Sequence, residues 1–546
     1  MFGNIIVDES ASLRVDHLLP VRVVAAEQCT QAEVLLRHRG GQAVVAGVEN
    51  CCDIQPGGWV LLDFGHEIHG GIELVSGTFP GVQYDSDADK GIRLHVTFGE
   101  SVSEALAAPD YCHAVQNMDL KVVPWSTVPC GELGFRFVRV ANADTKPYYA
   151  QGLRARFVRR DLERTASFES SDPVLNQIWE TAADTLELCM QRYLVDGIKR
   201  DRLVWMGDMY PEIVTCGLVF GKRKVVEDSL DFLRDGTPLP GFMNGLFGYT
   251  LWWILAHRCW FRYFGDLDYL RKQHDYLAGL VRLFAGMTGS NGEPAPAKFG
   301  ILDWATDNEC GDAVPGLKAL FVLAMRAAAE LLRLTDDPES AATADQLADG
   351  VRAQPIVPSA GGNALQVLAG LRPAEEVYDA FFARTLPKGL SPFLGCTTLD
   401  ACVMAGHKKE ALEHLRRYWG GMLTLGATSF WEHFDVDWLE NAARIDELVP
   451  AGKRDVHREC GSLCFKGLRN SFCHGWASQP AEWLIRNLLG ITFVSADEVA
   501  FSPDLCGLDF VRGSLQTPRG TISAEIEAGK EPRLELPRGI RLCGAN

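Results

Sequence analysis

The sequence lacks several features that would place it in common classes of protein. No apolar run approaches the roughly 20 residues that a membrane span requires, and the longest candidate, 249–256, is far too short. There is no Gly-rich loop that could cradle a phosphate, no dinucleotide-binding fingerprint and no G-x-S-x-G nucleophile motif. We therefore expect no membrane partner, and neither a nucleotide-dependent enzyme nor a serine hydrolase.

Positive charge is also scarce. The 546 residues include 53 Lys and Arg against 71 Asp and Glu, which gives a formal net charge of −18. Such a chain repels the nucleic-acid backbone, so we expect no nucleic-acid partner. The start of the chain has no basic segment followed by an apolar one, and the 16 cysteines are scattered as reduced core thiols are. The expectation is a cytoplasmic protein without a signal peptide.

Periodicity divides the chain into three expected domains. Residues 1–165 carry short apolar segments punctuated by Gly, Pro and Asp, which predicts an N-terminal β-sandwich. Residues 166–495 carry segments with helical spacing, and residues 496–546 return to strand-like alternation in a small C-terminal β domain. Strands of the first domain are expected at 59–65, 71–75, 93–100, 135–140 and 155–160.

The helical region begins with a clear start signal. Asp172 is a good N-cap residue and Pro173 suits the first turn of a helix. Consecutive helix pairs suit an (α/α)6 toroid, whose long loops gather at one mouth. Helices are expected to begin near residues 172, 209, 222, 247, 267, 315, 338, 363, 373, 395, 408 and 477.

The densest candidate for chemistry is the segment DGIKRDRLVWMGD, residues 196–208. It contains Asp196, Asp201 and Asp208 around Trp205. A salt-bridged loop between helices is one interpretation. The other is a sugar pocket, in which carboxylates bind hydroxyls, one carboxyl protonates a leaving oxygen and an indole covers an apolar sugar face.

A second patch, ATSFWEHFDVDW at 427–438, again alternates carboxylates with aromatic residues. It includes Trp431 and Glu432. On its own it could be a buried helix start with capping aspartates. Across a toroid mouth from the first patch, it could supply the second carboxylate of a glycosidase.

Two further patches and a group of possible metal ligands are less specific. ILDWATDNECGD contains Asp303 and Trp304 in a long loop, and NSFCHGWAS places His474 before a helix, where a structural hydrogen bond is its commoner role. We expect no metal, because five possible zinc ligands match no regular zinc spacing. These are His457, Cys460, Cys464, Cys473 and His474.

Together these motifs resemble the α-L-rhamnosidases of glycoside hydrolase family 78, over nearly the whole chain. Residues 162–182, LERTASFESSDPVLNQIWETA, are similar to the segment that enters that family's catalytic toroid. Residues 196–208 are similar to its signature: an aspartate, four residues, an acidic residue, then Arg, Trp, Gly and Asp. FWEHFD at 430–435 is similar to its Trp-Glu motif, SFCHGWASQPAEWL at 471–484 to its histidine segment, and GSLQTPRGTI at 513–522 to its C-terminal β domain.

The resemblance implies an inverting exo-acting α-L-rhamnosidase that acts on a carbohydrate substrate and needs no cofactor. It implies that Asp201 is the general acid and Glu432 the general base. Inversion requires one protonated and one ionised carboxyl, roughly 6.5–9.5 Å apart. The implied substrate-binding residues are Asp196, Arg200, Trp205, Asp208, Asp303, Trp304, Trp431 and His474.

Two departures from the family pattern keep alternatives open. Asp201 stands where the family usually has glutamate, so this acid is one methylene shorter. The region LFGYTLWWILAHRCW, 246–260, has no acid where the family often has Trp-x-x-x-Asp-Ala. The alternatives are a toroidal glycosidase for another terminal sugar, and a carbohydrate-binding pseudoenzyme that has lost efficient acid catalysis.

Overall fold

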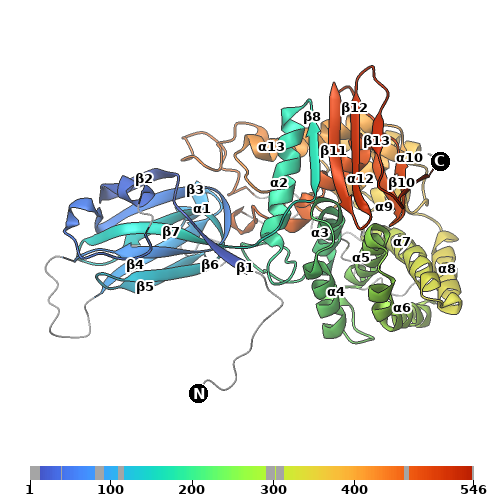
Figure 1. Ribbon diagram of the computed structural model, residues 1–546, viewed down its shortest axis with the longest axis horizontal. Helices are drawn as coiled ribbons and strands as arrows, with labels where there is room; N and C mark the ends of the chain where they lie inside the picture. The colour runs from blue at the N-terminus through green and yellow to red at the C-terminus, as the bar shows by residue number, and fades with distance from the viewer. Residues whose placement is uncertain are drawn as a thin grey trace.

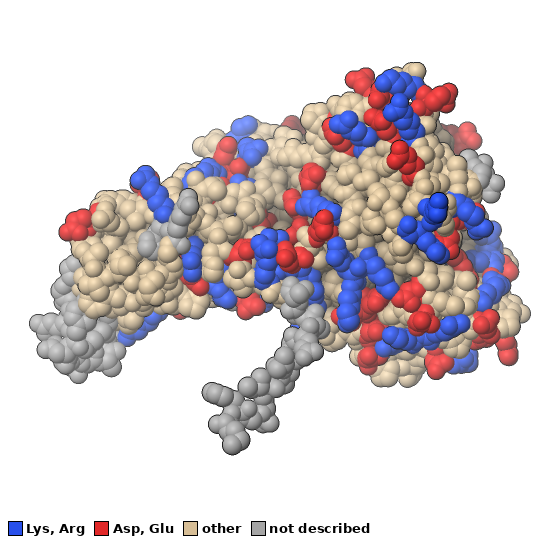
Figure 2. Space-filling model, viewed as in Figure 1, with Lys and Arg blue, Asp and Glu red and all other residues tan. Residues whose placement is uncertain are grey.

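The protein has two lobes that lie side by side in the computed structural model (Figure 1). Strands make up the N-terminal lobe, and the larger lobe contains the helices together with the C-terminal strands. On the face in Figure 2, acidic and basic side chains are interspersed over the larger lobe. The structure describes residues 13–37, 40–79, 91–108, 116–289, 302, 313–459 and 467–543.

A seven-stranded sheet forms the N-terminal lobe. All its strand pairs are antiparallel except β3 with β7, and β2 (Arg22–Thr30) pairs with β3 outside the main order. The strands predicted at 59–65 and 71–75 are parts of one long strand, β3, whose pairing with β6 shifts register between Asp63 and Ile68 and then resumes. The remaining order is β1 (Leu13–Leu18), β7 (Tyr148–Arg160), β3 (Cys52–Ser76), β6 (Thr127–Asn142), β4 (Ile92–Gly99) and β5 (Asn117–Val122).

The larger lobe contains helices where the periodicity predicts them. The carboxylate of Asp172 accepts a hydrogen bond from the Val174 amide and caps the first of them, which confirms that start signal. No helix in the described ranges is long and apolar enough to cross a membrane. The helices are α2 (Pro173–Cys189), α3 (Met206–Val219), α4 (Lys224–Gly236), α5 (Phe247–Phe264), α6 (Leu267–Met287), α7 (Ala313–Leu334), α8 (Pro338–Arg352), α9 (Asn363–Leu368), α10 (Ala374–Val377), α11 (Ala383–Thr385), α12 (Gly395–Met404), α13 (Lys408–Thr424) and α14 (Pro480–Leu484).

Alternate helices pack against one another in succession. α3 packs against α5, α5 against α7, α7 against α9 and α9 against α12, while α14 contacts both α2 and α3. Tryptophans fill much of the space between them, among them Trp253, Trp260, Trp419 and Trp483, whose side chains are fully buried. The packing sets the ends of α3 and α14 close together, and the segments that precede these helices form the site described below.

The C-terminal strands share a sheet with the start of the helical region. β8 (Ala166–Ser170), directly before α2, pairs with β11 (Phe510–Thr517) in the order β13-β12-β11-β8. The first and last parts of the larger lobe are therefore joined by a backbone ladder. The other strands are β9 (Ile491–Ser495), β10 (Glu498–Phe501), β12 (Gly520–Glu527), β13 (Arg533–Glu535) and β14 (Arg541–Cys543).

Candidate active site

Three segments that are distant in sequence meet beside α3 and α14. Gly197 and His474 form an isolated β-bridge. The His474 amide donates to the Phe430 carbonyl at 2.9 Å, and the Gly475 amide donates to the Asp196 carbonyl at 2.7 Å. These backbone bonds bring together the patches around residues 196–208, 427–438 and 470–478, and with them most of the candidate residues.

One guanidinium joins the two candidate catalytic carboxyls. Arg200 Nη2 lies 2.5 Å from Glu432 Oε2, and Arg200 Nη1 lies 3.2 Å from Asp201 Oδ2. Because the two η nitrogens belong to one rigid planar fork, these carboxylate oxygens lie no more than about 8 Å apart. That separation allows two carboxyls to flank one glycosidic bond.

Glu432 is held firmly in a buried position. Its side chain is 3% exposed, and its Oε2 accepts hydrogen bonds from Arg200 and, at 3.0 Å, from the Ser471 amide. Its backbone carbonyl accepts a bond from the Trp476 indole at 3.1 Å. Among the described residues both side-chain bonds end on Oε2, which leaves Oε1 to contact a water or a substrate.

Asp201 is presented differently, on a strained turn. Both Asp201 and Arg202 have left-handed backbone conformations, with φ of 54° and 53°. Such conformations cost non-glycine residues roughly 1–2 kcal/mol each and collect at functional sites. The turn leaves the Asp201 side chain 37% exposed although the neighbouring Arg200 is 5% exposed. Asp201 is therefore the more accessible of the two carboxyls, and it lies beside the buried ion pair of Arg200 and Glu432.

Asp208 and His474 form a buried pair next to Arg200. Asp208 Oδ1 lies 3.0 Å from His474 Nε2, and the Tyr249 side chain also hydrogen-bonds to Asp208. Burial, with the nearby charge of Asp201, raises the pKa of Asp208 to about 8, whereas burial lowers the pKa of His474 to about 4. Burial thus favours the uncharged form of each side chain.

Two further acids lie in this buried region. Asp196 Oδ1 accepts a hydrogen bond from the Leu203 amide at 2.8 Å, and burial together with Asp208 raises the pKa of Asp196 well above its usual range. Glu212, on α3, is fully buried, and neither of its oxygens has a hydrogen-bond partner among the described residues. Burial, and then Asp208, raises the pKa of Glu212 well above its ordinary value.

The raised pKa of Glu212 predicts a pH-dependent effect of Glu212→Gln. The folded state keeps a proton on Glu212 that the unfolded state releases above about pH 4.5. The contribution of Glu212 to the free energy of unfolding is therefore complete below pH 4.5 and is lost as the pH rises through the folded pKa. Glutamine is neutral at every pH. We expect the free energy of unfolding of Glu212→Gln, relative to that of the wild type, to increase by up to about 1.4 kcal/mol per pH unit above pH 4.5. Denaturant titrations from about pH 5 to pH 8 measure this, and a pH-independent difference would contradict it.

The candidate tryptophans occupy different environments. Trp205 is partly exposed at the start of α3 and contacts Tyr249 edge to face, with ring centroids 6.1 Å apart. Trp431 is fully buried and stacks on Phe472 at 4.0 Å. In this structure Trp431 supports the Glu432 segment from behind, whereas Trp205 is available to a ligand. Asp303 and Trp304 lie outside the described residues.

Several site residues carry no clear signal in the sequence. Tyr249 contacts both Trp205 and Asp208, and it lies in the segment 246–260, whose apolar composition gives no sign of a binding residue. Ser471 binds Glu432 through its backbone amide, which any residue except proline could do. The strongest sequence signal for the site is the density of charged residues at 196–208, which include Lys199 and Arg200.

One group of described residues has the composition of a metal site, but an ammonium lies within it. Ligand atoms of Glu100, Glu104 and His457 lie within 4.8 Å of one another. Lys199 Nζ lies 2.8 Å from Glu104 Oε1, 3.3 Å from Glu100 Oε2 and 3.4 Å from His457 Nε2. The lysine thus supplies the positive charge that such a cluster needs.

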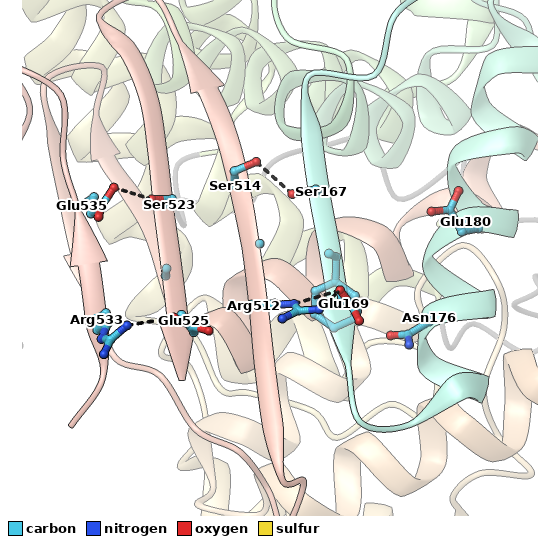
Figure 3. A pocket seen from close by; sticks show the side chains of 13 residues that line it. Ser167, Glu169, Asn176, Glu180, Arg512, Ser514, Ser523, Glu525, Arg533 and Glu535 are labelled. Atoms are coloured by element: carbon cyan, nitrogen blue, oxygen red, sulfur yellow. Dashed lines mark hydrogen bonds and ion pairs between the residues drawn. The ribbon is translucent and has the colours of Figure 1, made fainter. Parts of the chain in front are cut away.

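A hollow of about 690 Å³ lies on the C-terminal sheet beside α2 (Figure 3). None of the candidate residues lines it. Arg512 contacts Glu169 at 2.7 Å and Arg533 contacts Glu525 at 3.4 Å, so both arginines of the hollow pair with glutamates of the sheet. The site at Arg200 combines a partly exposed acid, Asp201, with a buried acid, Glu432. The residues that line this hollow include no such pair of acids.

Comparisons with known proteins find a matching family model and similar folds. Residues 163–354 match the family model described as the bacterial alpha-L-rhamnosidase 6 hairpin glycosidase domain. The chain is similar to a GH78 family rhamnosidase of Bacillus sp. GL1, with 21% identity and a TM-score of 0.72, over 91% of this chain and 53% of that one. The resemblance to the family 78 α-L-rhamnosidases is thereby confirmed.

Two other solved structures are similar in the same way. A rhamnosidase from Klebsiella oxytoca with rhamnose bound has 22% identity and a TM-score of 0.67, over 87% of this chain and 96% of that one. A Streptomyces avermitilis α-L-rhamnosidase complexed with L-rhamnose has 17% identity and a TM-score of 0.69, over 98% of this chain and 50% of that one. The chain thus spans about half the length of the Bacillus and Streptomyces enzymes. A comparison with curated proteins finds no match.

Proposed function

We propose that the protein is an inverting exo-glycosidase that hydrolyses terminal α-L-rhamnosyl residues of oligosaccharides or glycosides. The observation that carries this proposal is the pair of carboxyls, Asp201 and Glu432, held by the single guanidinium of Arg200. The family match over 163–354 supports the choice of sugar.

In this mechanism the two carboxyls act on opposite faces of the sugar. Asp201, protonated, donates its proton to the leaving oxygen, and Glu432, ionised, takes a proton from a water that attacks the anomeric carbon. Oε1 of Glu432 is the oxygen assigned to this water, because Oε2 is engaged by Arg200 and Ser471. The buried Asp208–His474 pair and Asp196 would bind sugar hydroxyls, with Trp205 against an apolar sugar face.

We further propose the three-domain arrangement expected from the sequence, with the helices as an (α/α)6 toroid, and a cytoplasmic location. The succession of packed alternate helices supports the toroid. One observation favours a different terminal sugar as the second candidate: Tyr249 lies beside Trp205 and Asp208 in the segment where the family often has an acid. That change would alter which sugar hydroxyls are bound.

The experiment that tests the function follows an aryl α-L-rhamnoside by proton NMR in the presence of the protein. We expect the β-anomer of rhamnose to appear first and then to equilibrate, because a single displacement inverts the anomeric centre. Initial release of the α-anomer would contradict inversion. Turnover of another aryl glycoside alone would establish the second candidate, and rhamnose binding without any turnover would establish a pseudoenzyme.

A further inference from the structure

The N-terminal lobe reaches the candidate active site through two buried acids. Glu100 follows β4, and Glu104 lies on the short helix α1 (Val102–Ala105). Both contact Lys199, at 3.3 Å and 2.8 Å, and all three side chains are completely buried. The Lys199 carbonyl also accepts a hydrogen bond from the Gln116 side chain at 3.0 Å. Lys199 directly precedes Arg200, so the lobe holds the residue next to the guanidinium that joins the two carboxyls.

The same lysine holds the segment on which Glu432 depends. Lys199 Nζ donates to the carbonyls of Leu468 and Asn470, at 2.6 Å and 2.9 Å. Arg200 Nε donates to the carbonyl between them, that of Arg469, at 2.8 Å. Three consecutive carbonyls are thus bound by two consecutive cationic side chains, which fixes the direction of the chain at 468–470.

The amides that follow bind the two acids on either side. The Phe472 amide donates to Glu100 Oε2 at 2.6 Å, and the Ser471 amide donates to Glu432 Oε2 at 3.0 Å. The Glu432 amide in turn donates to the Ser471 carbonyl at 2.8 Å. Residues 468–472 therefore connect an acid of the N-terminal lobe directly to the proposed general base. We refer to these residues as the clamp segment.

We infer that Glu100 and Glu104, acting through Lys199 and the clamp segment, are positioning residues for Glu432 and Arg200, so that the N-terminal lobe completes the active site. The inference rests on the proposed function. Its physical basis is that a displacement of about 1 Å at a catalytic group can cost a hundredfold in rate. Without the ammonium, two buried carboxylates would lose their shared cation, and the carbonyls of Leu468 and Asn470 would lose their hydrogen bonds from Lys199.

The test compares Lys199→Met with a matched control, Arg136→Met. Arg136 is also buried and also joins the two lobes: it pairs with Asp63 of its own lobe at 2.9 Å and donates to the Gly426 carbonyl of the larger lobe at 3.0 Å. None of its hydrogen bonds to described residues reaches Arg200, Asp201 or Glu432. We expect Lys199→Met to lower kcat about a hundredfold with KM changed less than about threefold. Arg136→Met should lower the Tm by a similar amount while its kcat stays within about threefold of the wild type.

A milder variant, Glu100→Gln, covers the case in which Lys199→Met does not fold. It keeps an acceptor for the Phe472 amide but removes the charge, and we expect kcat to fall about tenfold. Hydrogen–deuterium exchange of the peptide 467–473 should accelerate in Glu100→Gln and not in Arg136→Met.

The outcomes separate this inference from the proposed function. If the wild type turns over and both Lys199→Met and Glu100→Gln keep its kcat, or if exchange at 467–473 is unchanged, the positioning role is wrong. If the wild type hydrolyses no aryl glycoside, the proposed function fails, whereas the exchange measurement still reports whether Glu100 holds the clamp segment.

Discussion

Glu432→Gln is expected to lower kcat for every aryl α-L-rhamnoside by about a thousandfold, with little change in KM. Glutamine has the same shape as glutamate, and its carbonyl can still accept the bonds from Arg200 and the Ser471 amide. Its amide nitrogen would then stand in the place of Oε1, where it cannot take a proton from water. Steady-state kinetics on substrates with good and poor leaving groups measures the loss.

The matched control for this variant is Glu482→Gln. Glu482 is another buried glutamate paired with an arginine, Arg486, at 2.7 Å, and it lies on α14 outside the site. The same chemical change there should leave kcat within about threefold of the wild type, even where the Tm falls. A loss of less than about tenfold for Glu432→Gln would exclude it as the base.

Asp201→Asn is expected to cause a loss of similar size that depends on the leaving group. With a phenyl or alkyl leaving group, kcat/KM should fall about a thousandfold, because the departing oxygen needs a proton. With 2,4-dinitrophenol, which leaves readily as its anion, the loss should be about tenfold or less.

The comparison of the two variants across leaving groups assigns the roles. If Asp201→Asn lost the same factor on all substrates, Asp201 would not be the acid. Asp201→Glu is the informative companion, because it restores the methylene by which this residue is shorter than the family's usual glutamate. Retained activity in Asp201→Glu, with loss in Asp201→Asn, would show that the titrating group itself is required.

The helical part of the fold follows closely from the sequence. The Asp172 cap, the Pro173 position and the apolar spacing along α2 involve only residues within a few turns, so local sequence is enough to predict this helix. The sequence predicts two strands where the structure has the single long strand β3, because the continuity of β3 depends on pairing with β6 and β7, which local composition does not reveal.

The candidate site was predictable where charge and aromatic residues are dense. Asp201 and Glu432 follow from their motifs, and the structure brings both to Arg200. Tyr249 and the Ser471 amide were not predictable, because the first stands in an apolar helix and the second acts through its backbone. Glu100 had no motif at all, since its partner Lys199 comes from another part of the chain.

The ladder between β8 and β11 has a consequence for how the protein is made. Translation produces β8 before any of α2 to α14, whereas β11 emerges only after all of these helices. Until then β8 presents an open row of amides and carbonyls, the kind of edge at which growing chains can join one another. Ser167 and Glu169 alternate with the apolar side chains of this strand and keep its outer face polar during that interval. The ribosome must thus produce β11 before β8 can pair with it in the sheet.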